Sequence, residues 1–254
     1  MKTSLQFRPN TIRLTLCVSF FIVGLIFSQQ LFSQAWPVNL EGAPALQPGQ
    51  IETSLYFSGS YMSGSGKTNT IGYIPGVRIG FGIARIFDLK LSYSRGFYTL
   101  LSSKWEDTRQ NNLMISPKLS FVHGILAIKV PVTVILYKIS GNQIHADYLL
   151  SPRFIITAHY KQFFEFSFSP FCDILFQTKI NAAEYYQTAQ TWYFLGANLG
   201  FGFSSNMKRW SIRPEAYFSY PFPKPGERSN LMIFGWGLSA SVNFDAFKKK
   251  EKAK

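Results

Sequence analysis

The chain has 254 residues, with 26 Lys or Arg against 13 Asp or Glu, and its formal net charge is +13. Charged residues make up only 15% of it and aromatic residues 17%, whereas a soluble protein surface carries about 25–35% charged residues. The composition therefore argues against an ordinary water-exposed domain, and the length suits one domain.

The N-terminus has the pattern of a secretory signal peptide over residues 1–35. Its basic residues are Lys2, Arg8 and Arg13, and its apolar run covers residues 14–27. Small residues at a cleavage site follow at Ser33-Gln34-Ala35. The apolar run is shorter than the roughly 20 residues that a membrane-spanning helix needs. We expect cleavage after Ala35 and export, so nucleic acid is not an expected partner. Only Cys172 remains after cleavage, so no intrachain disulfide can form.

Residues 36–49 are rich in Pro and Gly and are expected to form an extended periplasmic leader. From residue 50 to residue 244 the chain alternates apolar with small or polar residues, the period of a β-strand with two unlike faces. Ten such segments lie near 50–62, 71–85, 89–99, 112–123, 125–137, 148–160, 164–176, 191–204, 210–221 and 231–244. Because no mature segment has about 18 consecutive apolar residues, membrane-spanning helices are excluded.

The connections between these segments alternate in length. The long ones are 63–70, 100–111, 138–147, 177–190 and 222–230, and the short ones are near 86–88, 124, 161–163 and 205–209. Long loops at one end and short turns at the other are typical of outer-membrane barrels. The sequence thus predicts an all-β fold, an antiparallel transmembrane β-barrel of about ten strands with both termini in the periplasm. A soluble lipocalin-like barrel also alternates, but its apolar face points inward.

The last segment carries a family resemblance. Gly235, Trp236, Gly237, Leu238 and Phe244 look like the aromatic-terminated final strand of the bacterial outer-membrane β-barrel families. The resemblance implies a place in the outer membrane of a bacterial cell, contact with its lipid, and recognition of this strand by the barrel-assembly machinery. A basic tail, residues 245–254, follows Phe244, so either Phe244 or Phe247 is the closing aromatic residue.

Charged residues on the small, polar face are expected to line the lumen. They are Arg78, Lys90, Lys118, Lys129, Arg153, Glu165, Asp173, Arg213 and Glu215, with Glu52 on the first strand. One wall is basic and the opposite wall largely acidic. The charges either neutralise one another in a plugged interior or create a field that favours small anionic solutes. Arg95 falls on the apolar face, so either it reaches the outer interface or a bulge at Gly96 shifts the register.

Three functions remain open. The first is a small porin-like channel with a charged lumen. The second is a structural or surface-binding barrel that acts through Trp105, Tyr185 and Tyr186 in its long loops. The third is an outer-membrane hydrolase, for which only two weak pairs, His145 with Asp147 and His159 with Glu165, are candidates. We expect no enzyme, and we assign no catalytic, cofactor-binding or metal-binding residue.

Overall fold

The structure, a computed structural model, describes residues 41–63, 70–100, 108–138, 144–161, 163–182, 185–187, 189–222 and 232–246. No helix in these ranges has the length and apolar character needed to cross a membrane. The elements are β1 (Gln50–Ser63), β2 (Thr70–Ala84), β3 (Phe87–Leu100), β4 (Thr108–Phe121), the 3-10 helix η1 (Val122–Gly124), β5 (Leu126–Lys129), β6 (Val132–Lys138), β7 (Ile144–Leu150), β8 (Arg153–Tyr160), β9 (Phe164–Gln177), β10 (Ile180–Ala182), β11 (Tyr185–Gln187), β12 (Gln190–Phe203), β13 (Trp210–Pro221) and β14 (Met232–Asp245).

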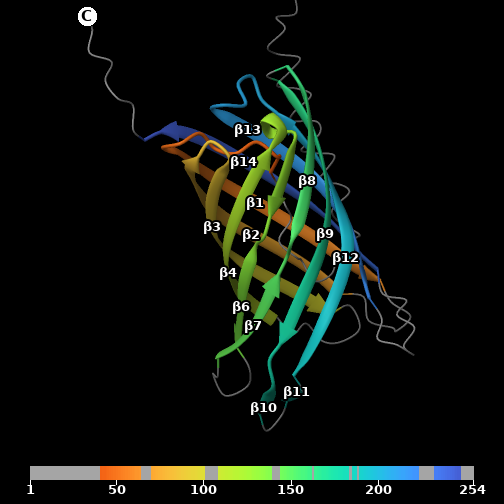
Figure 1. Ribbon diagram of the computed structural model, residues 1–254. Coiled ribbons are helices and arrows are strands. Elements are labelled where there is room, and N and C mark those ends of the chain that lie inside the picture. The colour runs from red at the N-terminus through yellow and green to blue at the C-terminus, as the bar shows by residue number, and fades with distance from the viewer. Residues whose placement is uncertain are drawn as a thin grey trace, which may run out of the picture. The chain divides into compact units, whose positions relative to one another are not determined.

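The strands close into one antiparallel barrel (Figure 1). β1 pairs with both β2 and β14, and β9 pairs with β12. β5 and β6 both pair with β4, while β7 and β8 both pair with β9, so each couple forms one wall strand. The described residues therefore build a wall of ten strands, which confirms the fold expected from the sequence. β10 and β11 form a separate hairpin between β9 and β12.

Two prolines explain why two of the wall strands are divided. Pro131 separates β5 from β6, and Pro152 separates β7 from β8. Proline has no backbone N–H and cannot donate to the ladder. Its carbonyl still accepts, since the Ser151 N–H donates to the Pro131 oxygen at 2.9 Å and the Cys172 N–H donates to the Pro152 oxygen at 3.1 Å. The wall therefore continues across both breaks.

The two ends of the barrel are named here by their connections. The turn end carries the connections 85–86, 122–125, 161–163 and 204–209, and the loop end carries 64–69, 101–107, 139–143, 178–189 and 222–231. Gln50 pairs with Asp245, so the barrel begins and ends at the turn end. The strands reach further toward the loop end than expected, and the two sets of connections differ less in length than predicted. Asp88, expected in a turn, lies in β3 and is fully buried.

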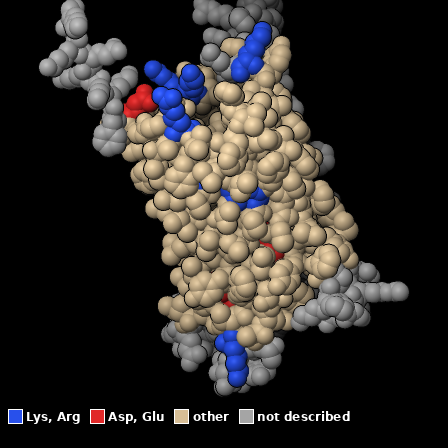
Figure 2. All heavy atoms as spheres, in the orientation of Figure 1, with Lys and Arg blue, Asp and Glu red and all other residues tan. Residues whose placement is uncertain are grey.

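The wall has an apolar outer face and a small or polar inner face. In β9, Phe168 is exposed, whereas Ser167 and Ser169 are buried; in β14, Val242 is exposed and Ser241 is buried. Uncharged residues cover most of the wall in view, and Lys and Arg gather toward its ends (Figure 2). A soluble lipocalin-like barrel has the opposite arrangement. The outer face of the described wall is therefore suited to contact with lipid, and the inner face to polar contacts.

β14 ends close to the predicted position. It runs to Asp245, and Phe244 faces outward with 54% of its surface exposed. Phe247, the other candidate for the closing aromatic residue, lies outside the described residues. Within the described chain, Phe244 is thus the last aromatic residue of the wall.

Arg95 keeps its place on the outer face. The ladder between β3 and β4 runs unshifted through Arg95, which pairs with Asn111, so the bulge considered at Gly96 is wrong. The Tyr93 hydroxyl donates to Asn111 Oδ1 at 2.8 Å on the same face. The guanidinium lies 5.6 Å from the centre of the Phe97 ring. Arg95 therefore belongs to a small polar band on the loop-end side of β3.

The outer face supplies a direct test of this arrangement. Leu199, exposed near the middle of the wall, becomes costly when replaced by Arg, because a charge there meets hydrocarbon. We expect Leu199→Arg to lower the free energy of unfolding by about 2–4 kcal/mol, measured by urea unfolding in lipid vesicles. The control Leu199→Phe keeps an apolar side chain and is expected to stay near wild type. Equal stability of the two variants would contradict a lipid-facing wall.

Candidate functional site in the barrel lumen

The described part of the leader, residues 41–49, turns back into the barrel. The Gln50 N–H donates to the Gln47 oxygen at 2.9 Å across Pro48 and Gly49, and Gly49 has a φ of 78°. Pro at the second position and positive φ at the third are features of a type II turn. A Cβ atom at Gly82 would lie 1.9 Å from the Gln47 oxygen. Only glycine therefore lets the leader pass this close to β2.

Beyond this turn, the leader is held by side chains of the inner wall. Ala43 is fully buried and Leu46 is 7% exposed. The contacts run from the Ala43 N–H to Thr157 Oγ1 (2.8 Å), from the Ser120 hydroxyl to the Ala43 oxygen, from Lys118 Nζ to the Gly42 and Pro44 oxygens (3.2 and 2.8 Å), and from the Leu46 N–H to Asp88 Oδ2 (3.1 Å). From the sequence, residues 36–49 were expected to form a leader outside the barrel, and none of these contacts was predicted.

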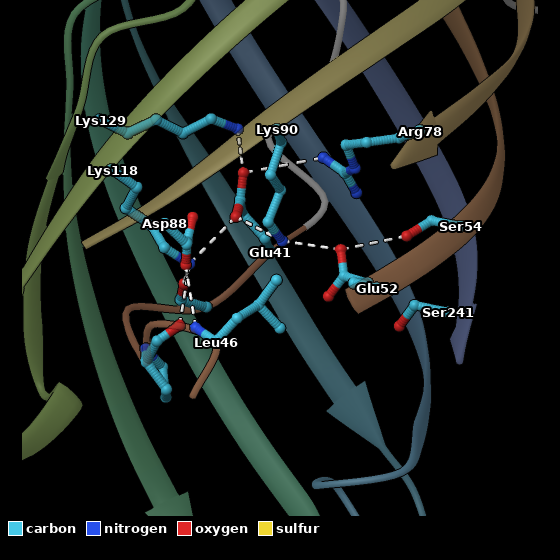
Figure 3. Close-up of polar contacts among 12 residues, drawn as sticks. Glu41, Leu46, Glu52, Ser54, Arg78, Asp88, Lys90, Lys118, Lys129 and Ser241 are labelled. Carbon is cyan, nitrogen blue, oxygen red and sulfur yellow. Dashed lines mark hydrogen bonds and ion pairs between the residues drawn. The ribbon is translucent and has the colours of Figure 1, made fainter. Parts of the chain in front are cut away.

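Glu41 lies at the centre of the site. Four cations on four strands surround its carboxylate, and we call them the basic cluster: Arg78 on β2, Lys90 on β3, Lys118 on β4 and Lys129 on β5 (Figure 3). The distances to Glu41 are 2.9 Å for Lys90 Nζ, 3.1 Å for Lys118 Nζ and 3.7 Å for an Arg78 Nη, with Lys129 Nζ in closer contact. All five side chains are at least nine-tenths buried. A single carboxylate thus joins four strands of the wall.

Two opposing effects set the charge of Glu41. Burial alone would raise the pKa of a carboxyl group, because it disfavours the charged form. The four surrounding cations outweigh burial and hold the pKa of Glu41 well below its ordinary value. Glu41 therefore stays anionic at neutral pH and under mildly acidic conditions.

Wall acids complete the ionic layer. Lys90 Nζ lies 2.7 Å from Glu52 Oε1, and Lys118 Nζ lies 3.2 Å from Asp88 Oδ2. On the opposite side the ion pairs and hydrogen bonds join Arg213 with Glu165, Arg153 with Asp173 (3.6 Å), Arg153 with Asn198 (3.2 Å), and Asn198 with Glu215. The basic and acidic sides are thus linked by contacts rather than separated by open space.

The structure places all nine residues expected to line the lumen on the inner face. Eight are buried, and the ninth, Arg213, has a side chain that is 16% exposed. The basic cluster holds four of the nine, Arg78, Lys90, Lys118 and Lys129. The other five, Arg153, Glu165, Asp173, Arg213 and Glu215, pair with one another or with Asn198 on the opposite side. Sequence reasoning missed Glu41 and Asp88. A turn signal, Pro48-Gly49, stood before β1 and could have indicated that the leader reverses.

An apolar layer fills the lumen on the loop-end side of the basic cluster. Its buried members are Tyr56, Ile74, Ile135, Leu149, Phe171, Leu175, Phe194, Tyr217 and Ile233. Two arginines lie against it, since the Arg153 guanidinium is 4.7 Å from the centre of the Phe171 ring and that of Arg78 is 5.8 Å from the Tyr56 ring. The described lumen therefore has two layers, one ionic and one apolar.

Both histidine pairs considered for catalysis are present as contacts in the structure. His145 lies in β7 rather than in a loop, and its Nε2 is 3.2 Å from Asp147 Oδ1 and 2.7 Å from Thr178 Oγ1. A nucleophile–His–acid triad needs the acid on the other ring nitrogen. His159 Nδ1 is 3.6 Å from Glu165, whose other oxygen contacts Arg213. In the described residues no group of three or more His, Cys, Asp or Glu is arranged to hold a metal ion.

The predicted loop residues are only partly described. Tyr185 and Tyr186 lie on β11, where they pair with Ala182 and Asn181 of β10. Trp105 lies outside the described residues, as do residues 1–40 and the tail from residue 247 onward.

Comparisons with known proteins give information on the fold only. No protein-family model matches the sequence, and no curated protein matches it. The N-terminal β-barrel domain of OprF from Pseudomonas aeruginosa is 13% identical over 78% of this chain and 98% of that chain, with a TM-score of 0.35. An outer-membrane channel from Pseudomonas putida F1 is 10% identical over 83% and 100%, with a TM-score of 0.45. The translocator domain of the autotransporter NalP from Neisseria meningitidis is 8% identical over 81% and 90%, with a TM-score of 0.44.

These likenesses are weak, so the strand pairing and the two faces of the wall carry the fold assignment. At the level of the fold, the resemblance to bacterial outer-membrane β-barrels expected from the sequence is confirmed.

Replacing Glu41 tests the ionic layer. Glu41→Gln keeps the size of the side chain but leaves the basic cluster without its shared anion. We expect a loss of roughly 3–5 kcal/mol in the free energy of unfolding, as for a buried ion pair that loses one partner, measured by urea unfolding in lipid vesicles. The control Gln47→Ala changes an exposed side chain of the same leader and is expected to stay within 0.5 kcal/mol or so of wild type. A Glu41→Gln variant as stable as this control would contradict the site.

The lowered pKa of Glu41 predicts how docking of the leader depends on pH. Its stabilising contribution is fully present above the ordinary carboxyl pKa and is lost only as the pH falls through the lower, folded pKa. At pH 4.5 we therefore expect the Ala43 and Leu46 amides to stay protected from hydrogen exchange in the wild type but not in Glu41→Gln. If these amides lost their protection in the wild type between pH 5 and pH 4.5, the pKa of Glu41 would not be lowered, and the prediction would be wrong.

Proposed function

We propose that this chain is an outer-membrane β-barrel that acts as a narrow porin-like conduit for small anionic solutes. The leader closes the half of the lumen nearest the turn end. The observation that carries the proposal is the convergence of four wall cations on one carboxylate inside the lumen. A lumen that holds this internal carboxylate has the chemistry to receive an anion from solution.

The outer face supports the membrane part of the proposal. Apolar side chains point outward along the described strands, and their rows end in polar or aromatic residues such as Tyr93, Tyr160, Tyr220 and Trp210, all exposed. This is the arrangement of a barrel in lipid with interfacial girdles. By the usual orientation of such barrels, the turn end faces the periplasm and the loop end faces outside.

The described lumen is in a closed state. Its lining charges are buried, and both the leader and the apolar layer occupy it. A barrel of about ten strands has a lumen little wider than its side chains fill. Conduction therefore requires the leader to withdraw and the apolar layer to rearrange. Without Glu41, the ionic layer holds one cation in excess, which favours anions.

Planar-bilayer recording tests the conduit. We expect the mature chain to be silent or rarely open, and deletion of residues 36–46 to give discrete, anion-selective steps. In the deleted barrel, charge reversal at Arg78, Lys129 and Arg153 is expected to turn the preference toward cations, because it changes the sign of one wall. A heat-shift gel checks folding of each variant. Silence of both the folded deletion variant and the same variant with Phe194→Ala would contradict a conduit.

One observation favours a second candidate, a surface-binding barrel. The β10–β11 hairpin continues past β9 and β12 at the loop end and carries Tyr185 and Tyr186 (Figure 1). Under this candidate, replacement of residues 180–187 by a Gly-Ser linker abolishes surface cross-linking of the barrel to its partner and leaves the heat-shift gel unchanged. Under the conduit proposal, the same replacement leaves conductance of the leader-deleted barrel unchanged.

A further inference from the structure

We propose that the basic cluster is a binding site for small monocarboxylates, and that Glu41 occupies it as an internal ligand which a free carboxylate can replace. As a statement about the transported solute, this proposal rests on the proposed conduit. The experiment described below measures binding independently of conduction.

Both oxygens of the Glu41 carboxylate contact the basic cluster. One oxygen of Glu41 contacts Lys129 and Arg78, and the other contacts Lys90 at 2.9 Å and Lys118 at 3.1 Å (Figure 3). Charge-assisted hydrogen bonds of this kind are stronger than neutral ones. Because the four cations come from four different strands, the barrel wall itself fixes their positions. The site is thus a feature of the wall, and only its occupant comes from the leader.

The basic cluster carries more positive charge than the wall acids in contact with it can balance. The described wall brings two acids into contact with the basic cluster, Glu52 at Lys90 and Asp88 at Lys118. Four cations therefore face two wall anions. Burying unbalanced charge is costly, so the site favours an added anion. When the leader is absent, a carboxylate from solution can supply this negative charge.

The leader is detachable, because the hydrogen bonds given above for residues 41–46 go to wall side chains. Backbone–backbone hydrogen bonds are formed at Gly49, whose N–H donates to the Gly82 oxygen at 2.9 Å and whose oxygen accepts from the Ala246 N–H at 3.0 Å. The ladders that close the barrel need none of these bonds. The leader can therefore withdraw, with the turn at residues 47–50 as its pivot, while the wall stays paired.

The present occupant indicates the class of anion. Glu41 fills the site with one planar carboxylate, each of whose two oxygens contacts two cations. Gly42 and Ala43, which follow Glu41 in the leader, are both buried, so a withdrawn leader leaves room for a short tail. A monoanionic, planar carboxylate such as acetate fits these conditions better than a tetrahedral phosphate dianion.

The test uses Glu41→Ala in the full mature chain, which leaves room for acetate. We expect acetate, added at constant ionic strength with NaCl, to raise the thermal midpoint of the detergent-folded variant in proportion to the logarithm of its concentration above the dissociation constant. Acetamide, which has the same shape without the charge, is expected to have no effect. Wild type is expected to respond weakly, because Glu41 is tethered beside the site. A second substitution, Lys129→Gln, is expected to abolish the response.

Refolding keeps the proposal testable where Glu41→Ala does not fold in buffer. In that case we expect acetate, but neither acetamide nor phosphate, to restore the folded band on a heat-shift gel. No acetate-specific stabilisation or rescue would overturn the site, and a stronger effect of phosphate would overturn the carboxylate class. A barrel that binds acetate but never conducts refutes the conduit alone, whereas one that conducts without binding acetate refutes the site alone.

Discussion

The structure depends on how charge is neutralised inside a barrel whose outside is apolar. Lipid outside the wall leaves the lumen as the place for ionisable side chains, and a lumen of about ten strands has little room for water. Arg78, Lys90, Lys118 and Lys129 would be a costly group of like charges in such a place. Glu41 resolves this by entering from the leader and contacting all four. A segment outside the barrel strands is thus part of the barrel's electrostatic design.

The same constraint explains the layers of the lumen. Toward the turn end, acids and bases from nearby strands meet in pairs such as Arg213 on β13 with Glu165 on β9, the two strands that flank β12. Toward the loop end, residues such as Ile74, Phe194 and Ile233 fill the interior with apolar side chains. Arg78 and Arg153 lie at the boundary, each against an aromatic ring and within reach of an acid. A solute that crosses this barrel has to displace an ionic contact and then part an apolar layer.

The sequence predicts the wall well because the relevant signal is local. Alternation along β9 or β14 can be read from a few neighbouring residues, and it identifies both the strand and its inner face. Glu41 could not be predicted in this way, since its contact with Lys118 joins residues 77 positions apart and no period links them. Asp88 was misplaced because a turn of only two residues, 85–86, precedes β3. The divided strands follow from Pro131 and Pro152, which cannot donate to the ladder, and alternation alone does not reveal such breaks.

The most direct test of this account is a double-mutant cycle between Glu41 and Lys129, with urea unfolding of the wild type, Glu41→Gln, Lys129→Gln and the double variant in lipid vesicles. We expect the double variant to be more stable than the sum of the single losses allows, with a coupling energy of about 1–3 kcal/mol. Strictly additive losses would show that the leader carboxylate and the basic wall do not interact, and would contradict the central role given to Glu41.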